Sequence, residues 1–436
     1  MSKLEEVAQE IAKFDYVRFS ICDLNGMSRG KVVASRHSKK YLENGLEMSQ
    51  DILLHGPRTL SLDYMKYDLG SALIVPDLDT LRAIPWAPEG VKVAELLCET
   101  RWKTDNTPHG ACPRYAARKQ LQRLADLGLT FYSSHEIEFQ LLDGKTLKTV
   151  FDGHDSYSQK VFNKHAKIIF HFDKNYQESK VDVEKHHVEL SPGVFEFVTK
   201  PNYGLKSMDM VFNLKEGLLE MADLKGLKAT FMSHFTSKEQ IALSTDLNFS
   251  LWNISGGNVF YDANAPDKLS TVAKQWIAGI LKHSKALSAF ASPTVNCYRN
   301  FDCQLKPTVP SWGIEDREAC LRIKNEGPLK TYIENRLPTG KCNVYLVAAS
   351  TIAAGLDGVI KKMECPPPGT SEHDESLPRS LAEALDELEQ DEELCDALGK
   401  ELVAWFVKYK RDTEIAKYED VKADEERFLF EKEDYL

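Results

Sequence analysis

The sequence lacks a paired-cysteine motif, a long apolar run and a surplus of basic residues. Its nine cysteines are an odd number scattered along 436 residues, and no two of them form a C-x-x-C pair. This pattern argues against a disulfide scaffold or a thiolate zinc site, and it is typical of reduced thiols in a cytosolic protein.

No segment has the pattern of a membrane helix or a signal peptide. The most apolar stretch, residues 344–360, is interrupted by Ser350, Thr351 and Asp357 and is shorter than the roughly 20 apolar residues that span a bilayer. The first ten residues, MSKLEEVAQE, are polar and acidic where a signal peptide is basic and then apolar. We therefore expect a cytoplasmic protein that does not contact a membrane.

The acidic charge is concentrated in the last part of the chain. The net charge is −11, and residues 371–436 alone carry 22 acidic and 9 basic side chains. The preceding 370 residues are therefore close to neutral and show no segregated basic face. Because phosphate is repelled by an acidic protein without such a face, we expect no nucleic-acid partner.

Short alternating runs in the first hundred residues predict a small sheet, with Asn25-Gly26 as a tight turn between two strands. A helix is predicted to begin at Pro113 and to end at Gly128. We place a domain boundary near Gly110, which gives an N-terminal domain of residues 1–110 and a larger domain of residues 111–436. The predicted strands lie at 17–26, 71–80, 91–100, 131–139, 193–200, 244–252 and 333–337, and the longer helices at 208–224 and 272–290. Strands and helices do not alternate regularly, so the fold class is α+β.

Two strand-like segments carry pairs of carboxylates. Glu136 and Glu138 project from one face of their strand while Ile137 and Phe139 face the core. Glu189 and Glu196 bracket a Ser-Pro-Gly turn, and a hairpin there would bring them together. A cation between such groups and a solvated outer face are both compatible with this pattern. His187, in the same segment, has no partner at zinc-ligand spacing and is interpreted as structural.

A third strand and a group of arginines complete the candidate chemistry. Asp246, Asn248 and Ser250 alternate with apolar residues, which suits a hard cation, a hydrogen-bonded ligand or a half-exposed strand. Farther along, the chain carries Arg317, Arg322, Glu334 and Arg336. Arginines beside carboxylates either form ion pairs or hold the oxygens of a phosphate or carboxylate ligand.

Taken in this order, the segments resemble glutamine synthetases of type I over essentially the whole chain, and within that family the lengsin branch. The segments that carry the resemblance include DLNGMSRGK, IVPDLDT, HEIEFQLLD, ELSPGVFEF, NFSLW, KQWIAGILKHSKALSAFASPT, CLRI and IENRLP. The resemblance implies an N-terminal β-grasp domain and a catalytic domain with an open antiparallel barrel. It also implies homo-oligomeric rings, such as a double-ringed dodecamer with sites between neighbouring subunits. The family uses ATP and two or three Mg²⁺ or Mn²⁺ ions to join glutamate and ammonia.

Residue by residue, the resemblance implies specific roles. One metal site would be Glu138, Glu189 and Glu196, and the other Glu136, Glu334 and Asp246, where the family carries histidine. Ser250 and Arg322 would bind the nucleotide, and Arg317, Arg336 and Asn300 would occupy catalytic positions. Asp51 is expected to contribute to a neighbour's site.

The substrate pocket departs from the family pattern. The family's Gly-Ser-Gly turn is Ala242-Leu243-Ser244 here, a family arginine is Asn300, and the flap run 302–307 contains no glutamate. Three further family residues, Asn, Arg and Gln, are replaced by Asp316, Tyr332 and Val194. Losing one arginine that stabilises a transferring phosphoryl group costs roughly a thousandfold in rate in comparable enzymes.

These observations leave three hypotheses. The eroded pocket favours a metal-binding homologue in which glutamate–ammonia ligation is lost or much weakened, retained for its assembly and for structural protein partners. The complete carboxylate set favours an active ATP-dependent ligase for another small acid or amine. A metal-dependent hydrolase or deaminase is disfavoured because no nucleophile or water-activating histidine is evident.

Overall fold

The N-terminal region forms a six-stranded mixed sheet in the computed structural model, which describes residues 1–55, 70–235, 242–302, 306–369, 376–418, 421 and 423–436. Its strand order is β2-β1-β6-β4-β3, and β5 also pairs with β6. Only β1 and β6 run parallel among these strands. The strands are β1 (Tyr16–Cys22), β2 (Ser28–Ala34), β3 (Leu46–Ser49), β4 (Ser71–Pro76), β5 (Arg82–Ala83) and β6 (Val93–Trp102).

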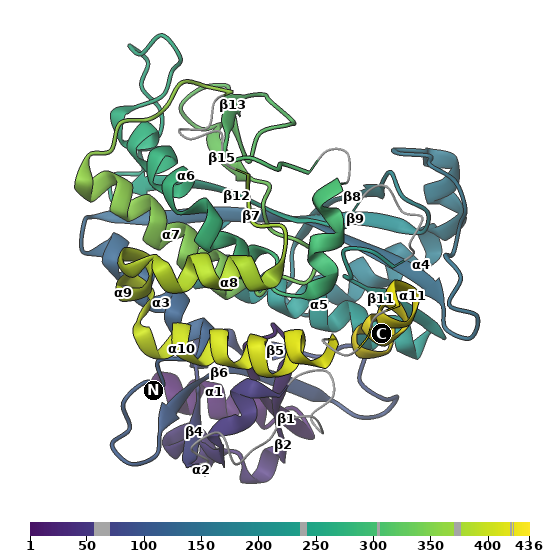
Figure 1. Ribbon diagram of the computed structural model, residues 1–436. Helices are drawn as coiled ribbons and strands as arrows, with labels where there is room; N and C mark the ends of the chain where they lie inside the picture. The colour runs from purple at the N-terminus through teal and green to yellow at the C-terminus, as the bar shows by residue number, and fades with distance from the viewer. Residues whose placement is uncertain (56–69, 236–241, 303–305, 370–375, 419–420, 422) are drawn as a thin grey trace.

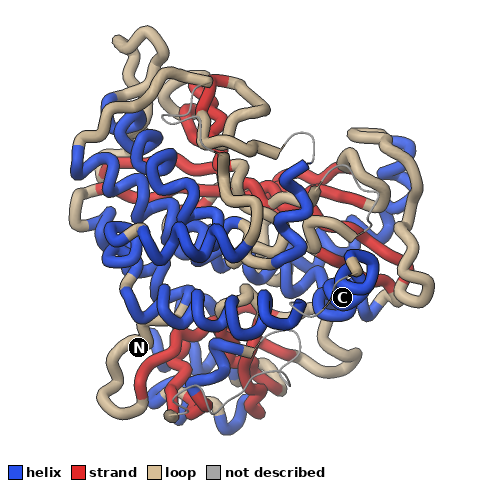
Figure 2. Tube along the Cα trace, viewed as in Figure 1, coloured by secondary structure: helices blue, strands red, loops and turns tan. Residues whose placement is uncertain are grey.

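A second, nine-stranded sheet carries most of the polar residues discussed above, and Figure 2 shows it lying above the first sheet with helices between them. Its order is β13-β14-β15-β12-β7-β9-β8, and β10 and β11 also pair with β7. The strands are β7 (Leu129–Asp143), β8 (Val183–Val188), β9 (Val194–Thr199), β10 (Asn202–Tyr203), β11 (Leu227–Thr230), β12 (Thr245–Asn253), β13 (Trp312–Ile314), β14 (Leu321–Asn325) and β15 (Thr331–Asn335). The 15-residue strand β7 therefore organises this sheet.

Helices cover the sheets, and the last of them lies beside β11 (Figure 1). They are α1 (Lys3–Ile11), α2 (Lys39–Asn44), α3 (Pro113–Ala125), α4 (Gln159–Glu178), α5 (Leu205–Leu224), α6 (Thr271–Ala291), α7 (Val344–Lys361), α8 (Leu381–Gln390), α9 (Glu392–Leu398), α10 (Lys400–Tyr409) and α11 (Asp424–Tyr435). Short helical turns include η2 (Gln50–Leu54) and η6 (Val295–Asp302).

Helices α6 and α7 pack closely because glycine allows their backbones to approach. A Cβ atom at Gly279 would lie 2.2 Å from the carbonyl oxygen of Ala354, and one at Gly358 would lie 2.1 Å from that of Gln275. Helix α7 is apolar and long enough to cross a membrane by composition, but 78% of its residues are buried inside the protein. It is therefore the core helix of this fold.

Most predicted elements are confirmed, and the class is α+β. The turn at Asn25-Gly26 joins β1 to β2, and Gly26 has a φ of +79° that favours glycine. Helix α3 begins at Pro113 as predicted but ends at Ala125, before Gly128. Gly399, whose φ is +106°, separates α9 from α10, so Leu398 and Leu402 are buried from two different helices. The domain boundary near Gly110 stays a prediction.

Candidate active site

Strand register gathers the polar residues on one face of the second sheet. Glu136 on β7 lies opposite Asp246 on β12, and Glu138 lies opposite Glu196 on β9. On the other side, Asn248 on β12 faces Glu334 on β15, which in turn faces Arg322 on β14. Directly paired residues project from the same face of a sheet, so one row of side chains crosses five strands.

The first carboxylate group consists of Glu136, Asp246 and Glu334. One oxygen from each lies within 4.8 Å of the others. The side-chain amide of Asn248 donates to Glu136 Oε1 at 2.9 Å, and Arg322 Nη1 donates to Glu334 Oε2 at 3.1 Å. Asp246 Oδ1 is buried and has no hydrogen-bond partner among the described residues. An unpaired buried carboxylate oxygen points to a cation as its missing partner.

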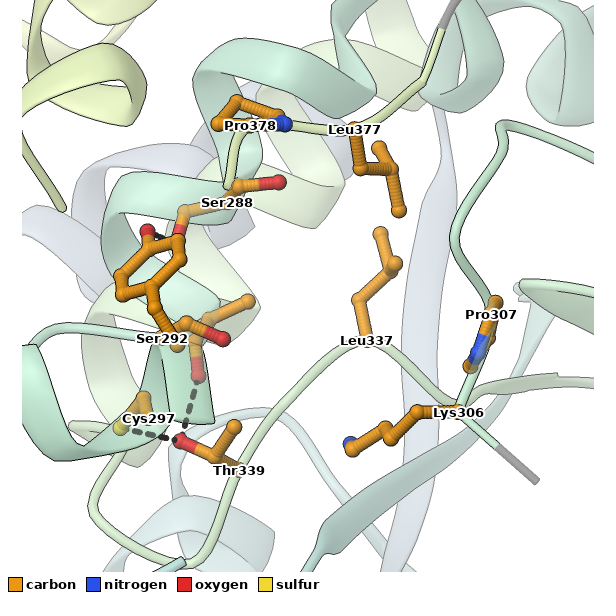
Figure 3. Close-up of a pocket in the computed structure, with 11 residues that line it drawn as sticks. Ser288, Ser292, Cys297, Lys306, Pro307, Leu337, Thr339, Leu377 and Pro378 are labelled. Carbon is orange, nitrogen blue, oxygen red and sulfur yellow. Dashed lines mark hydrogen bonds between the residues drawn. The ribbon is translucent and has the colours of Figure 1, made fainter. Parts of the chain in front are cut away.

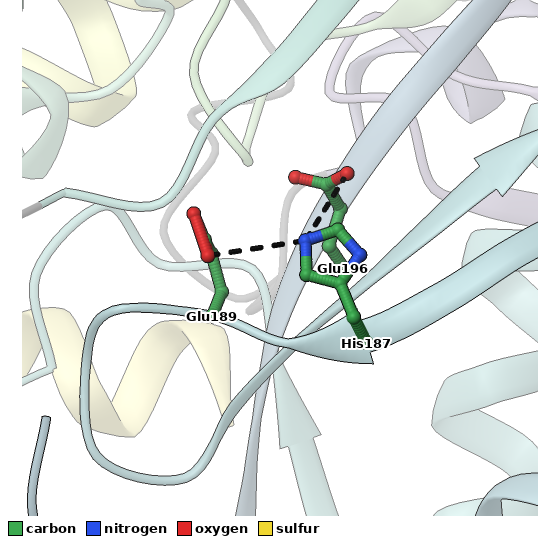
Figure 4. A group of neighbouring side chains, drawn as sticks. All are labelled: His187, Glu189 and Glu196. Atoms are coloured by element: carbon green, nitrogen blue, oxygen red, sulfur yellow. Dashed lines mark ion pairs between the residues drawn. The ribbon is translucent and has the colours of Figure 1, made fainter. Parts of the chain in front are cut away.

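The second group contains a histidine (Figure 4). His187 Nε2 lies 3.7 Å from Glu196 Oε1 and 3.9 Å from Glu189 Oε2. Among the described residues, His187 Nε2 and Glu189 Oε2 are buried without a hydrogen-bond partner. The interpretation of His187 as purely structural therefore misses its place in this cluster. Imidazole and carboxylate groups together form a ligand set for a divalent ion such as Mn²⁺.

Glu138 lies between the two groups. Its Oε2 accepts a hydrogen bond from the backbone N–H of Ser244 at 2.9 Å. It faces Glu196 across the strand pair, but the compact group of possible ligands around Glu196 contains His187 rather than Glu138. The structure thus brings together all six carboxylates expected at the site, with Glu138 positioned to join either group.

Burial raises the pKa of several of these carboxyl groups. The pKa of Glu138 rises to about 8, and that of Glu334 to about 7, through burial and then through neighbouring carboxylates. Burial likewise raises the pKa of Asp246 to about 6 and that of Glu196 well above its usual range. Burial lowers the pKa of His187, so its ring is neutral at pH 7 and able to bind a metal. Keeping these carboxylates ionised without a cation is costly, and the residues fit a pair of divalent ions.

A cavity of about 590 Å³ opens over this row of residues. Carboxylates line one part of its wall, and Arg317, Arg322, Lys324 and Arg336 line another. Arg336 Nε lies 3.4 Å from Glu334 Oε1, and its Nη1 donates to the carbonyl oxygen of Arg317. A cavity with both signs of charge can hold cations and anionic oxygens side by side.

Lys306 is a site residue that sequence reasoning missed. It lines the acidic cavity, and its Nζ donates to the carbonyl oxygens of Arg336 at 3.2 Å and Pro338 at 3.5 Å. Burial lowers its pKa, while Asp246 and Glu138 act to raise it. Lys306 also lines a side cavity of about 50 Å³ (Figure 3). Lys306 therefore borders both the acidic cavity and this smaller space.

Comparison with known proteins identifies the fold and its relatives. The family model for the glutamine synthetase catalytic domain matches residues 110–429. Lengsin of Rattus norvegicus is 31% identical over 442 residues, covering 94% of this chain and 75% of that protein. Glutamine synthetase of Thermotoga maritima is 30% identical, covering 90% of this chain and 91% of that protein.

The chain belongs to the glutamine synthetase family. A solved structure described as a GmaS complex with ADP superimposes with a TM-score of 0.85 at 26% identity, covering 99% of this chain and all of that one. A glutamate–isopropylamine ligase of a Pseudomonas species is 27% identical, covering 86% of this chain and 84% of that protein. The glutamine synthetase relatives thus include a ligase for an amine other than ammonia.

Three residues expected from the resemblance, Ser250, Asn300 and Asp51, are not among the described residues that line the cavity. Ser250, expected to contact the nucleotide, is buried, and its hydroxyl accepts a hydrogen bond from Trp252 Nε1 at 2.9 Å. The side chain of Asn300 and residues 303–305 of the flap run lie outside the described residues. Asp51 lies in η2, 3.4 Å from His55 Nε2.

Ala242, Leu243 and Ser244 stand where the resemblance implies a Gly-Ser-Gly turn. Ala242 and Ser244 line the cavity, and Leu243 between them is buried. Arg299, next to the position where the resemblance implies an arginine, pairs with Glu431 of α11 at 3.0 Å. Its guanidinium is therefore engaged by the C-terminal helix, and Arg299 is not among the described residues that line the acidic cavity.

Proposed function

We propose that this chain binds divalent cations in the acidic cavity and that its joining of glutamate to ammonia is lost or much weakened. The observation that carries the proposal is the row of five carboxylates on one sheet face, joined by Glu189 just after β8, with buried ligand atoms on Asp246 and Glu189 that lack a hydrogen-bond donor among the described residues. Such atoms are satisfied by a metal ion. Bound divalent ions would neutralise phosphoryl charge if ATP enters the cavity.

The chain's own residues hold this site in place. Arg322 and Arg336 fix Glu334 from two sides, at 3.1 Å and 3.4 Å, and Asn248 fixes Glu136. The backbone N–H of Ser244 orients Glu138. These contacts organise the carboxylates before a cation arrives, which reduces the conformational cost of binding.

The weakened ligation is supported by Lys306, Ala242 and Ser244, which line the same cavity. Lys306 brings an ammonium group next to Asp246 and Glu138, where it repels a second cation such as ammonium. Ala242 and Ser244 carry side chains where glycine would leave room for a substrate. The added positive charge disfavours ammonium and the added side chains leave less room for glutamate, so ligation of the two is weakened.

Calorimetry with Mn²⁺ and Mg²⁺, together with phosphate release from ATP, tests the proposal. We expect Mn²⁺ binding in the unmodified protein, loss of at least tenfold in affinity in Glu138→Ala, and no phosphate release with glutamate and ammonium or hydroxylamine. Glu184→Gln, on the exposed part of β8, is the matched control and should bind Mn²⁺ normally. Glutamate-dependent turnover that disappears in Glu138→Ala would contradict the loss of ligation.

A second candidate is an ATP-dependent ligase for another carboxylic acid or amine. The complete carboxylate set, the arginines beside it and the isopropylamine ligase among the relatives favour it. The same phosphate-release assay with a panel of acids and alkylamines separates the two candidates. Turnover with one pair, abolished in Glu138→Ala, would establish the ligase.

We further propose a ring-shaped homo-oligomer, such as a double-ringed dodecamer, in the cytoplasm. Membership of the glutamine synthetase family supports this assembly, in which Asp51 would approach a neighbour's cavity. Light scattering after size-exclusion chromatography tests it, and a monomer at micromolar concentration would overturn it. ATP as a ligand is tested by calorimetry in the presence of Mn²⁺.

A further inference from the structure

A second cavity, outside the candidate active site, lies where the N-terminal turn, helix α5 and the C-terminal helix meet. Figure 1 shows α11 beside β11 and α5, and this cavity has a volume of about 290 Å³. Its wall includes Met27, Leu219, Ala229 and Phe231 as apolar residues. The volume is at the lower end of the roughly 300 to 1,000 Å³ that is typical of small-molecule pockets.

Two lysines that line this cavity have no carboxylate partner in the described part of the chain. Lys215 Nζ donates to the carbonyl oxygens of Gly340 at 2.7 Å and Cys342 at 3.2 Å. Lys341 Nζ lies over the ring of Tyr435, 4.4 Å from its centre. Burial lowers the pKa of both lysines, and that of Lys341 falls to about 8 with Lys215 as a further cause. Glu216 acts to raise the pKa of both lysines, but neither forms an ion pair within the described residues, and two neighbouring ammonium groups are costly to bury.

Several other charged groups around the cavity already have partners. Lys228 and Asp223 pair with each other at 2.9 Å. Asp434 pairs with Lys417 and accepts a hydrogen bond from the hydroxyl of Tyr418 at 3.1 Å. Glu216 also lines the cavity, and burial raises its pKa to about 7. Glu433 and the last residue, Leu436, line the cavity as well. The cavity therefore presents two lysines without an ion-pair partner in the described part of the chain, together with several carboxyl groups, of which Glu216 has its pKa near neutral pH.

We propose that this cavity binds a small carboxylate whose charged group contacts Lys215 and Lys341. The apolar residues Leu219 and Phe231 would contact the ligand's alkyl part. If the ligand also carries an ammonium group, as an amino acid does, Glu216 would release its proton and pair with that group as a carboxylate. This inference does not depend on the proposed function of the acidic cavity.

The test uses three probes that share one alkyl chain: butyrate, 2-aminobutyrate and butylamine, measured by ligand-observed NMR and calorimetry on the full chain at constant ionic strength. We expect butyrate and 2-aminobutyrate to bind and butylamine not to bind. Lys341→Met should weaken butyrate binding at least tenfold, while Lys341→Arg keeps it within threefold. Lys228→Met is the matched control, because Lys228 lines the same cavity but already has Asp223 as partner.

Each outcome decides the proposal. Tighter binding of 2-aminobutyrate than of butyrate, abolished by Glu216→Gln, identifies an amino acid as the preferred ligand class. Equal binding of the two identifies a simple carboxylate. Binding that survives in Lys341→Met, or that is lost in Arg336→Met, would place the ligand elsewhere and overturn the proposal. Absence of butyrate binding to the unmodified protein would overturn it as well, whatever the acidic cavity does.

Discussion

Replacement of Glu138 by glutamine tests whether the carboxylates form a cation site. Glutamine has the same shape, and its amide oxygen can still accept the hydrogen bond from the Ser244 backbone. The substitution removes the ionisable group, and with it the negative charge that a cation would stabilise, without opening a cavity. Two effects of opposite sign are expected: a gain in stability without metal and a loss of the response to metal.

The size of the gain follows from the pKa of Glu138, which burial and then Asp246 raise from 4.5 to about 8. Since the pKa of Glu138 is higher in the folded state, the folded protein holds more protons than the unfolded chain. The folded state therefore loses stability as pH rises from about 4.5 to about 8. At about 1.4 kcal/mol per pH unit, the ceiling at pH 7.5 is about 4 kcal/mol. Because Glu138 is only half-buried and its surroundings relax, we expect about 1–2 kcal/mol for Glu138→Gln.

Differential scanning calorimetry at pH 7.5, with and without Mn²⁺, measures both effects. Unfolding entropy of about 2.1 cal/mol/K per residue converts 1–2 kcal/mol into a Tm increase of about 1–2 °C for the metal-free variant. Mn²⁺ at a hundredfold excess over Kd adds about 2.7 kcal/mol to the unmodified protein, or about 3 °C. A tenfold weaker variant should show about half of that shift.

The matched control is Glu184→Gln, which replaces an exposed glutamate on β8 and should change neither Tm value. A metal-free Glu138→Gln protein that is less stable than the unmodified one, and that keeps the full Mn²⁺ shift, would refute the reasoning. It would mean that Glu138 acts as an ordinary hydrogen-bond acceptor and shares no cation with its neighbours.

Three further predictions concern Lys306, His283 and Gly279. Lys306→Met removes an ammonium group beside the carboxylates, so the affinity for Mn²⁺, measured by calorimetry, should rise about tenfold. An unchanged affinity would show that Lys306 does not face the cations. Burial acts to lower the pKa of His283, but its hydrogen bonds to Asp391 and Asp357 outweigh burial and raise the pKa. The charged ring therefore stabilises the fold fully below pH 6.5, and this stabilisation is lost as pH rises through the folded-state pKa. In urea denaturation, His283→Gln should cost about 3 kcal/mol at pH 6 and less at pH 9, and a pH-independent cost would contradict this. Gly279→Ala should lower stability by about 1–3 kcal/mol, because its Cβ would lie 2.2 Å from the Ala354 carbonyl oxygen, whereas a gain would mean that helix propensity outweighs the clash.

Local patterns in the sequence predict much of the fold and the strand faces on which several site residues lie, whereas the set of six carboxylates follows only from the resemblance to the family. Alternation over 244–252 predicts β12, and the same alternation places Asp246 and Asn248 on one face. Glu136 and Glu138 are two residues apart on one strand, so their shared face also follows from local geometry. These features depend on neighbouring residues, which sequence reading captures well.

The remaining features depend on contacts between distant segments. His187 joins Glu196 only because β8 and β9 pair in one particular register, which no local signal specifies. Lys306 lies in a segment without a recognisable motif, and a single lysine before a proline does not by itself indicate a site residue. Arg299 pairs with Glu431, more than a hundred residues away, and this contact could not be inferred from either segment alone.

The arrangement of the acidic cavity has a consequence for the order of folding. Glu136, Asp246 and Glu334 come from strands separated by about a hundred residues each, so their geometry exists only after β12 has docked between β7 and β15. Closing such long loops is slow, and a cation has no preformed ligand set in the nascent chain. Cations therefore cannot template this fold, and their uptake would be among the last events in its maturation.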